Sequence, residues 1–311
     1  MYNTFIRQHS LTILTAFAAL LLAALPIQQA RADGFSLGGA TAYAVLYEGG
    51  GGNQLSITNV TVNGNIGVAG TGTVQFGGPG TINGSLDFAA SNTGQFSNTN
   101  GSNVGPTSTN YNVGAVQTAM NYVNTLSSTL AGYAGNSVAI NVGNGGNQII
   151  NASSGNLVNG NEVFNVTGVS FVNGATLTIN GDGLGHNVVF NISQSGDGQF
   201  GGVINLTGGL TSDNVLFNFV GGANLKGGDS SQLNNNGEAF LTGTFLDPNG
   251  AISVVHTDLN GRVFGGDTTN MQIVSGDTIT APMSTPEPSS LALLATGLFG
   301  LFGFARRKLN S

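Results

Sequence analysis

The chain of 311 residues has no cysteine and few charged side chains. Without cysteine it can form neither disulfides nor thiolate metal sites, and it has no cysteine nucleophile. Only 7 % of its residues are charged, against about 25 % in an average domain. Basic residues are scarcest: between residues 33 and 285, thirteen acidic residues face only Lys226 and Arg262, a net charge of about −11. Such a surface repels nucleic-acid phosphates, so we expect no nucleic-acid partner.

Glycine and asparagine take the place of the missing charges. The 51 glycines make up about 16 % of the chain, where about 7 % is usual. This composition disfavours a helical enzyme and favours short strands joined by tight turns. Asn-Gly pairs supply such turns because both residues tolerate positive φ. Ten of these pairs begin at Asn63, Asn83, Asn100, Asn144, Asn159, Asn173, Asn180, Asn236, Asn249 and Asn260.

A repeat in the first third of the chain indicates the fold. Residues 62–68 read VNGNIGV, and residues 82–88 read INGSLDF, twenty positions later. The apolar side chains fall at the same steps around the same Asn-Gly turn. An offset near 20 is typical of stacked coils of a β-solenoid, in which each coil climbs one strand spacing of about 4.8 Å. Hairpins use the same turn chemistry, so a β-sandwich is the alternative fold.

One segment has helical periodicity. Apolar residues recur at helical spacing within residues 113–131, which predicts one amphipathic helix packed along the flank of the strand stack. These apolar residues are Val116, Met120, Val123, Leu126 and Leu130.

The strand pattern resumes after this helix. Residues 187–192 (NVVFNI) and 213–219 (DNVLFNF) share an apolar core interrupted by asparagine. Continuous apolar runs suit strands that are covered on both faces. We expect the asparagines to stack across coils as hydrogen-bonded ladders, since a buried amide without a partner is costly.

The first 32 residues have the features of a secretory signal peptide: Arg7, an apolar run over residues 11–25, and the small-residue site Ala30-Arg31-Ala32. The expected partners here are the Sec translocon and signal peptidase. The predicted order is a signal helix (1–32), a β domain (33–280), a linker (281–285) and a C-terminal segment (286–311).

The C-terminal segment combines a Pro-Glu-Pro motif, an apolar run over residues 291–304 and a basic cluster. The motif is Pro286-Glu287-Pro288, and the cluster is Arg306-Arg307-Lys308. This order resembles the PEP-CTERM sorting signal of Gram-negative bacteria. The resemblance implies a C-terminal transmembrane helix, recognition by an exosortase, and a protein that is anchored in the inner membrane before release to the cell surface or extracellular matrix.

Three further segments carry a second resemblance. Residues 215–219 (VLFNF), 241–250 (LTGTFLDPNG) and 259–266 (LNGRVFGG) resemble the choice-of-anchor A family. Residues 37–46 and the 62–68 repeat resemble the opening of that family, so the likeness extends over most of residues 37–279. It implies an exported domain joined to a surface anchor. The repeat-then-helix order resembles bacterial ice-binding β-solenoids more weakly.

Titratable groups are too sparse to predict catalysis. Asp182, His186 and Ser193 or Ser195 could form a triad, but no Gly-x-Ser-x-Gly elbow positions the serine. We therefore expect no catalytic residue. His256 is expected on a strand, facing water. The two histidines lack a third ligand in the sequence, so no metal centre is expected.

Four aspartates recur every 15 to 16 residues: Asp182, Asp197, Asp213 and Asp229. Stacked on one edge of a solenoid, they would serve a polysaccharide-acting enzyme. In Gly-rich or Ser-rich turns, however, Asp usually caps its own backbone. Asp182-Gly183 and Asp197-Gly198 leave Ca²⁺ open, although neither completes a known calcium loop. No other cofactor is expected.

Threonines at positions 71, 73, 176 and 178 could build a flat hydroxyl face suited to ice or glycan, although no long Thr-x-Thr array is present. We predict a non-enzymatic, exported structural or adhesive protein of the cell surface or biofilm matrix that associates with exopolysaccharide through its polar face. The alternatives are a polysaccharide-acting enzyme and an ice- or cation-binding surface protein.

Overall fold

The computed structural model describes residues 34–92, 95–99, 104–172, 174–227, 239–267 and 269–282. The predicted signal helix, the C-terminal transmembrane helix and the sorting motif lie outside these residues. Within the described ranges, no helix combines the length and apolar character needed to span a membrane.

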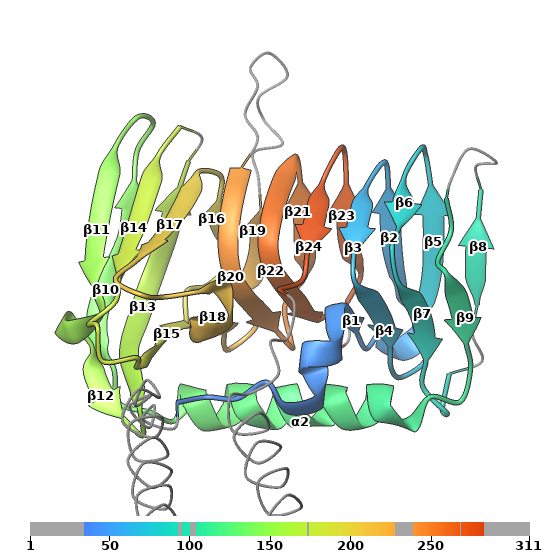
Figure 1. Cartoon of the computed structure of the whole chain (residues 1–311), viewed down its shortest axis with the longest axis horizontal. Coiled ribbons are helices and arrows are strands. Elements are labelled where there is room, and N and C mark those ends of the chain that lie inside the picture. The colour runs from blue at the N-terminus through green and yellow to red at the C-terminus, as the bar shows by residue number, and fades with distance from the viewer. Residues whose placement is uncertain are drawn as a thin grey trace, which may run out of the picture.

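The described strands form one hydrogen-bonded network wound as a parallel β-helix with three sides (Figure 1). Neighbouring coils pair in parallel throughout, except where β12 (Asn156–Val158) pairs antiparallel with β13. The predicted β-solenoid is therefore confirmed, and the alternative β-sandwich is wrong, because a sandwich is built from antiparallel neighbours.

We call the three sides A, B and C. Side A consists of β11 (Asn147–Asn151), β14 (Thr176–Asn180), β17 (Val203–Thr207), the first parts of β20 (Ala239–Asp247) and β22 (Thr257–Gly265), β24 (Thr278–Thr280), β3 (Thr61–Asn63) and β6 (Thr81–Ile82). Side B consists of the first parts of β10 (Asn136–Val142) and β13 (Asn161–Phe171), then β15 (Asn187–Ile192), β18 (Val215–Phe219), the last parts of β20 and β22, β1 (Tyr43–Tyr47), β4 (Asn65–Val68), β7 (Ser85–Phe88) and β9 (Ser108–Asn110).

Side C consists of the last parts of β10 and β13, then β16 (Asp197–Phe200), β19 (Asn224–Gly227), β21 (Ile252–Val255), β23 (Met271–Val274), β2 (Gln54–Thr58), β5 (Thr73–Gly77) and β8 (Phe96–Asn98). Among the described residues, the helices are α2 (Gly114–Ala131) and the short 3₁₀ helices η1 (Gly38–Ala42), η2 (Gly50–Gly52), η3 (Ala152–Ser154) and η4 (Ser212–Asn214).

The first and last coils of the body lie next to each other in the middle of the stack. Strands β22, β23 and β24 pair with β1, β2 and β3, as the red and blue strands of Figure 1 show. The chain builds one end of the stack first, crosses along α2 to the other end, and then returns coil by coil to its start.

The 20-residue repeat is confirmed in the first coils, where Val62 pairs with Ile82 and Ile66 with Leu86. The coils that follow α2 are longer, and Val188 pairs with Val215, 27 positions on. The last coils return to the shorter offset, since Asp258 pairs with Thr278, 20 positions on. A single sequence period therefore fails in the coils directly after α2.

Stacked phenylalanines fill the interior behind side B. Phe164, Phe190, Phe217 and Phe245 come from successive coils, and their ring centroids are 5.2, 5.1 and 4.7 Å apart. Offset stacking at this spacing adds to the burial of each ring. One contiguous apolar core thus extends along the stack.

The predicted helix is confirmed as α2, and it covers the outer face of side B. Its buried residues Val116, Met120 and Val123 pack with Val189 and Leu216, which point outward from β15 and β18. These strands are apolar on both faces because the core covers one face and the helix the other.

The predicted asparagine ladder is also present on side B. Asn218 Nδ2 donates to Asn191 Oδ1 at 2.9 Å and to the Ser127 carbonyl of α2 at 3.0 Å. Asn191 Nδ2 donates to the Leu130 carbonyl at 2.7 Å. The ladder therefore ties the helix to two coils while satisfying amides that have no access to water.

Candidate functional site

Side A presents two outward rows of mainly Thr and Asn side chains, because alternate residues of each strand point the same way. The first row, in coil order, is Asn147, Thr176, Val203, Phe240, Asp258, Thr278, Thr61 and Thr81. The second row stands two residues further along the strands and is Ile149, Thr178, Asn205, Thr242, Asn260, Thr280, Asn63 and Asn83.

Hydrogen bonds between coils fix part of the second row. Asn83 Nδ2 donates to Asn63 Oδ1 at 2.8 Å, and Asn63 Nδ2 donates to Thr280 Oγ1 at 3.1 Å. Neighbouring members of a row are about 4.8 Å apart, the spacing of paired strands. Side A is thus an array of mainly hydroxyl and amide groups at a regular spacing, interrupted by the apolar side chains of Ile149, Val203 and Phe240. Asp258 is the one charged side chain in the two rows.

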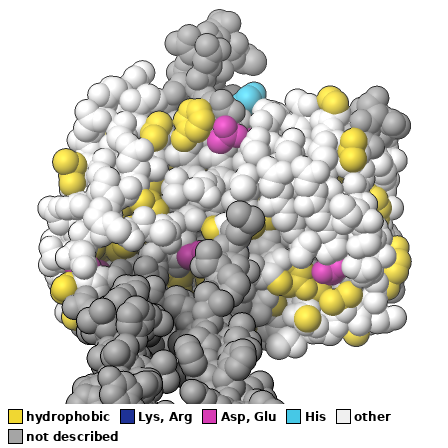
Figure 2. Space-filling view, in the orientation of Figure 1, with side chains coloured by type: hydrophobic (Ala, Val, Ile, Leu, Met, Phe, Trp, Pro, Cys, Tyr) yellow, Lys and Arg dark blue, Asp and Glu magenta, His cyan; other side chains and the backbone are white. Residues whose placement is uncertain are grey.

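Side C is polar as well but carries longer side chains. Its central outward row is Asn141, Ser170, Gln199, Lys226, Ser253, Gln272, Ser56, Gln75 and Ser97. Gln and Lys have more rotatable bonds than Thr, so this face is less regular. Figure 2 shows one face of the molecule on which charged side chains are few and white groups, which are backbone and uncharged polar side chains, predominate, while several hydrophobic side chains lie together at the lower right.

The four aspartates do not form a stacked series. Asp182 follows β14, Asp197 begins β16 on side C, and Asp213 lies in η4, while Asp229 lies outside the described residues. The coil length here is 27 rather than 15 or 16, so Asp197 faces Asn224 and accepts a hydrogen bond from it at 2.8 Å. The structure therefore gives no support to a carboxylate row of a polysaccharide enzyme.

The triad of Asp182, His186 and Ser193 or Ser195 does not form in the structure. Asp182 and His186 are in contact, but His186 precedes β15, whereas Ser193 and Ser195 follow it. Six extended residues place the two ends of this strand about 20 Å apart. Ser195 instead lines a cavity of about 370 Å³ whose lining includes no acid, base or histidine.

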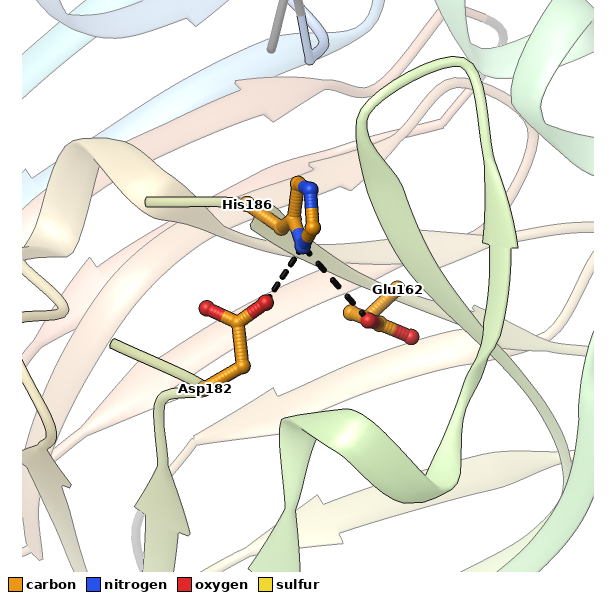
Figure 3. Close-up of side chains that lie close together, drawn as sticks. All are labelled: Glu162, Asp182 and His186. Carbon is orange, nitrogen blue, oxygen red and sulfur yellow. Dashed lines mark hydrogen bonds and ion pairs between the residues drawn. The ribbon is translucent and has the colours of Figure 1, made fainter. Parts of the chain in front are cut away.

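Asp182 and His186 belong to a cluster with Glu162 (Figure 3). Asp182 Oδ2 contacts His186 Nδ1, and Glu162 Oε1 lies 3.7 Å from the same nitrogen. Glu162 was not predicted as a site residue, because it lies on β13, 20 positions before Asp182 in the sequence. The parallel pairing of β13 with β15 places Glu162 beside Val188, close to His186.

The surroundings shift the pKa values of both carboxyl groups. Burial raises the pKa of Glu162, the charge of His186 opposes this, and Asp182 adds to it. Burial alone would also raise the pKa of Asp182, but hydrogen bonds from the Leu184 backbone and from His186 outweigh it and hold this pKa below its usual value. The other histidine, His256, is exposed at the turn between β21 and β22 with φ of +49°, so its predicted position on a strand is wrong.

The remaining predicted site residues lie outside the described part of the chain. They are the cleavage-site residues Ala30 and Ala32, the motif Pro286, Glu287 and Pro288, and the basic cluster Arg306, Arg307 and Lys308. Of the predicted linker, Ala281 packs against the core and Pro282 accepts a hydrogen bond from Arg262.

Family models match both parts of the chain. One, described as an ice-binding-like adhesive domain, matches residues 30–275, and the PEP-CTERM protein-sorting motif matches residues 284–308. No curated protein sequence matches the chain.

Three solved structures of ice-binding proteins are similar to this fold. The protein of the Antarctic ascomycete Antarctomyces psychrotrophicus is 16 % identical, with a TM-score of 0.50 over 81 % of this chain and 100 % of the other. The Arctic yeast protein LeIBP is 16 % identical, with a TM-score of 0.50 over 83 % and 99 %. The protein of an Antarctic Flavobacteriaceae bacterium is 19 % identical, with a TM-score of 0.51 over 82 % of this chain and 49 % of the other. At such identities the likeness shows the fold alone.

These matches correct one prediction and confirm another. The main domain matches the ice-binding-like adhesive family rather than choice-of-anchor A, to which residues 215–219, 241–250 and 259–266 had pointed. Those segments lie on, or directly after, β18, β20 and β22, which belong to successive coils. The PEP-CTERM motif predicted from the tail is confirmed.

Proposed function

The chain belongs to the family of ice-binding-like adhesive domains, and we propose that it is an exported, non-enzymatic adhesin of the cell surface that binds through side A. The observation that carries the proposal is the pair of Thr and Asn rows, which repeat at the strand spacing and contain a single charge. A rigid periodic face binds best to a periodic partner, because each of its groups then makes the same contact. Side chains that are already ordered also lose little conformational entropy on binding.

The partner is a surface of regularly spaced hydroxyl groups. Such groups both donate and accept hydrogen bonds, as do the Thr hydroxyls and Asn amides of side A. Ice and an ordered polysaccharide, such as an exopolysaccharide of the matrix, share this chemistry. The similar solved structures are ice-binding proteins, which supports ice as the first partner to test.

The sorting motif supports delivery to the outside of the cell. A PEP-CTERM motif marks an exported protein that an exosortase processes. We propose inner-membrane anchoring before processing and display on the cell surface or in the extracellular matrix afterwards. Replacing Pro286 and Glu287 by alanine is expected to keep the protein in the membrane, and unchanged release would contradict this step.

Substitution of one threonine tests the binding face. Thr61→Tyr puts a bulky ring into the run of three threonines that ends the first row, between Thr278 and Thr81. We expect the full-length chain with this change to lose at least about tenfold in binding, since a ring there lifts several neighbouring groups off a flat partner. Binding is measured as adsorption to growing ice and, separately, to crystalline cellulose, which stands for an ordered polysaccharide.

The matched control is Ser253→Tyr, which places the same ring on the central row of side C. Binding to either material that Thr61→Tyr abolishes and Ser253→Tyr preserves would support the proposal and identify the partner. Equal binding of both variants, or no binding of the wild-type chain to either material, would contradict it.

A further inference from the structure

We propose that Glu162, Asp182 and His186 form a binding site for a divalent transition-metal ion, with Zn²⁺ or Mn²⁺ as the fitting ions. This site is separate from the outward rows of side A, and the proposal does not depend on adhesion.

The geometry brings three ligand atoms to one point. One oxygen of each carboxylate and one ring nitrogen of His186 all lie within 4.8 Å of one another. Figure 3 shows both carboxylates turned toward the same nitrogen, Nδ1. The residues come from three segments, namely β13, the turn after β14, and the residue preceding β15, so the cluster joins a corner of neighbouring coils.

The state of Glu162 is an independent observation that points to a ligand. Its side chain is only 7 % exposed, and its one contact with an opposite charge is the 3.7 Å separation from His186 Nδ1, beyond hydrogen-bonding distance. Within the described ranges no hydrogen bond reaches this carboxylate. Its oxygens therefore have no hydrogen-bond donor within the described ranges, and a cation between the three ligand atoms would give them a partner.

The donor set selects the class of metal. One imidazole nitrogen and two carboxylate oxygens suit Zn²⁺, which takes four ligands and would accept water as the fourth, and they also suit Mn²⁺. Ca²⁺ prefers six to eight oxygens, and the cluster offers an imidazole in place of most of them. The structure thus favours a transition metal over the calcium loop that the Asp182-Gly183 pair had left open.

The site also adjoins the start of the body. Asn161, next to Glu162, accepts a hydrogen bond from the Phe35 backbone N–H at 2.7 Å, and Asn187, next to His186, donates to the Phe35 carbonyl at 2.9 Å. A metal ion at the cluster would hold both flanking residues in place. We therefore infer that metal binding braces the docking of the N-terminal segment onto the stack.

Calorimetric titration of the metal-stripped full-length chain with Zn²⁺, Mn²⁺ and Ca²⁺ tests the site. We expect one saturable Zn²⁺ or Mn²⁺ site per chain and a rise in Tm of about 5–10 °C at a hundredfold excess over Kd. His186→Gln and Asp182→Asn should each weaken binding by about 100-fold or more, since loss of a supporting partner alone costs about 10- to 100-fold. Hydrogen exchange around Phe35 should slow when the metal binds.

The matched controls are His256→Gln and Asp197→Asn, which remove the same groups from places outside the cluster. If either cluster variant fails to fold, X-ray absorption of the zinc-loaded wild-type chain replaces it, and a spectrum with a single imidazole among oxygen ligands supports the site. Zn²⁺ binding that is absent, or equal in the cluster and control variants, would overturn the proposal. Preference for Ca²⁺ would overturn the choice of metal class.

Discussion

Among single residues, Asp267 gives the body its clearest dependence on pH. Asn124 Nδ2 of α2 donates to Asp267 Oδ2 at 3.0 Å and to Glu48 Oε2 at 3.1 Å, so the two carboxyl groups lie together under the helix. Burial, with the charge of Glu48 added, raises the pKa of Asp267 from 3.8 to about 7. Burial likewise raises the pKa of Asp247 to about 7, although two backbone N–H groups donate to it.

The sign of the pH effect follows from these shifts. The folded state holds protons on Asp267 and Asp247 up to about pH 7, whereas the unfolded chain releases them near pH 4. Since the folded state binds more protons in this window, stability falls as pH rises from about 4 to about 7.

Asp267→Asn should therefore remove part of this decrease in stability with rising pH. We expect the variant to match the wild-type chain near pH 4 and to exceed its stability by about 1–2 kcal/mol at pH 8, an effect reduced by solvent screening. Urea unfolding at several pH values measures this, with Asp258→Asn on the outer surface of side A as the control. A variant that is less stable than the wild-type chain at pH 8 would show that the Asp267 carboxylate stabilises the fold.

At the scale of elements, glycines allow the coils to turn closely between sides A and B. Gly243 and Gly261 are paired in register within β20 and β22, and a Cβ at Gly261 would lie 1.8 Å from the Gly243 carbonyl oxygen. A Cβ at Gly84 would similarly lie 2.2 Å from the Gly64 carbonyl oxygen. The glycines of the Asn-Gly pairs at these corners are thus needed for room between stacked backbones.

Gly261→Ala should separate β20 from β22 and lower the free energy of unfolding by on the order of 3 kcal/mol, because backbone rather than a flexible side chain must move. Gly143→Ala is the matched control, since a Cβ there meets nothing within 4 Å. Thermal unfolding of both variants decides the matter: a Tm for Gly261→Ala equal to that of the control would mean that the corner is loosely packed.

The Asn-Gly pairs also show how far sequence could specify the elements. Asn159 and Gly160, with φ of 47° and 75°, form a two-residue turn between antiparallel β12 and β13. The pairs at Asn63 and Asn83 instead turn corners of parallel coils. Local turn chemistry permits both a hairpin and a corner between parallel coils. Which of the two forms depends on the strand with which the chain pairs, and the local sequence does not specify that strand.

For the whole molecule, the sequence predicted what repeats locally and missed what closes at long range. The parallel coils, α2 and the Asn191–Asn218 ladder follow from periodicity and from the cost of buried amides. The meeting of β22 with β1 joins residues more than 200 positions apart, and no periodic pattern reports it. Glu162 was missed for the same reason, since only coil stacking brings it to His186.

The buried side chain of Arg262 contacts residues from both ends of the body. It is 1 % exposed, and its guanidinium donates to the Asp213 carboxylate, to the Thr41 carbonyl at 3.3 Å and to the Pro282 carbonyl at 3.1 Å. Thr41 lies near the start of the body and Pro282 at its end. One buried cation thus joins both ends of the chain's path to the coil between them.

Removing Asp213 and removing Arg262 should lower the free energy of unfolding by different amounts. Asp213→Ala leaves the guanidinium buried without a counter-charge and should lower the free energy of unfolding by about 3 kcal/mol. Arg262→Met leaves behind a carboxylate whose side chain is 42 % exposed and can be hydrated, so we expect a smaller loss of about 1–2 kcal/mol. Urea unfolding of both variants at pH 7 gives the comparison. A larger loss for Arg262→Met would mean that its bonds to the Thr41 and Pro282 carbonyls, rather than the ion pair, hold the two ends of the body together.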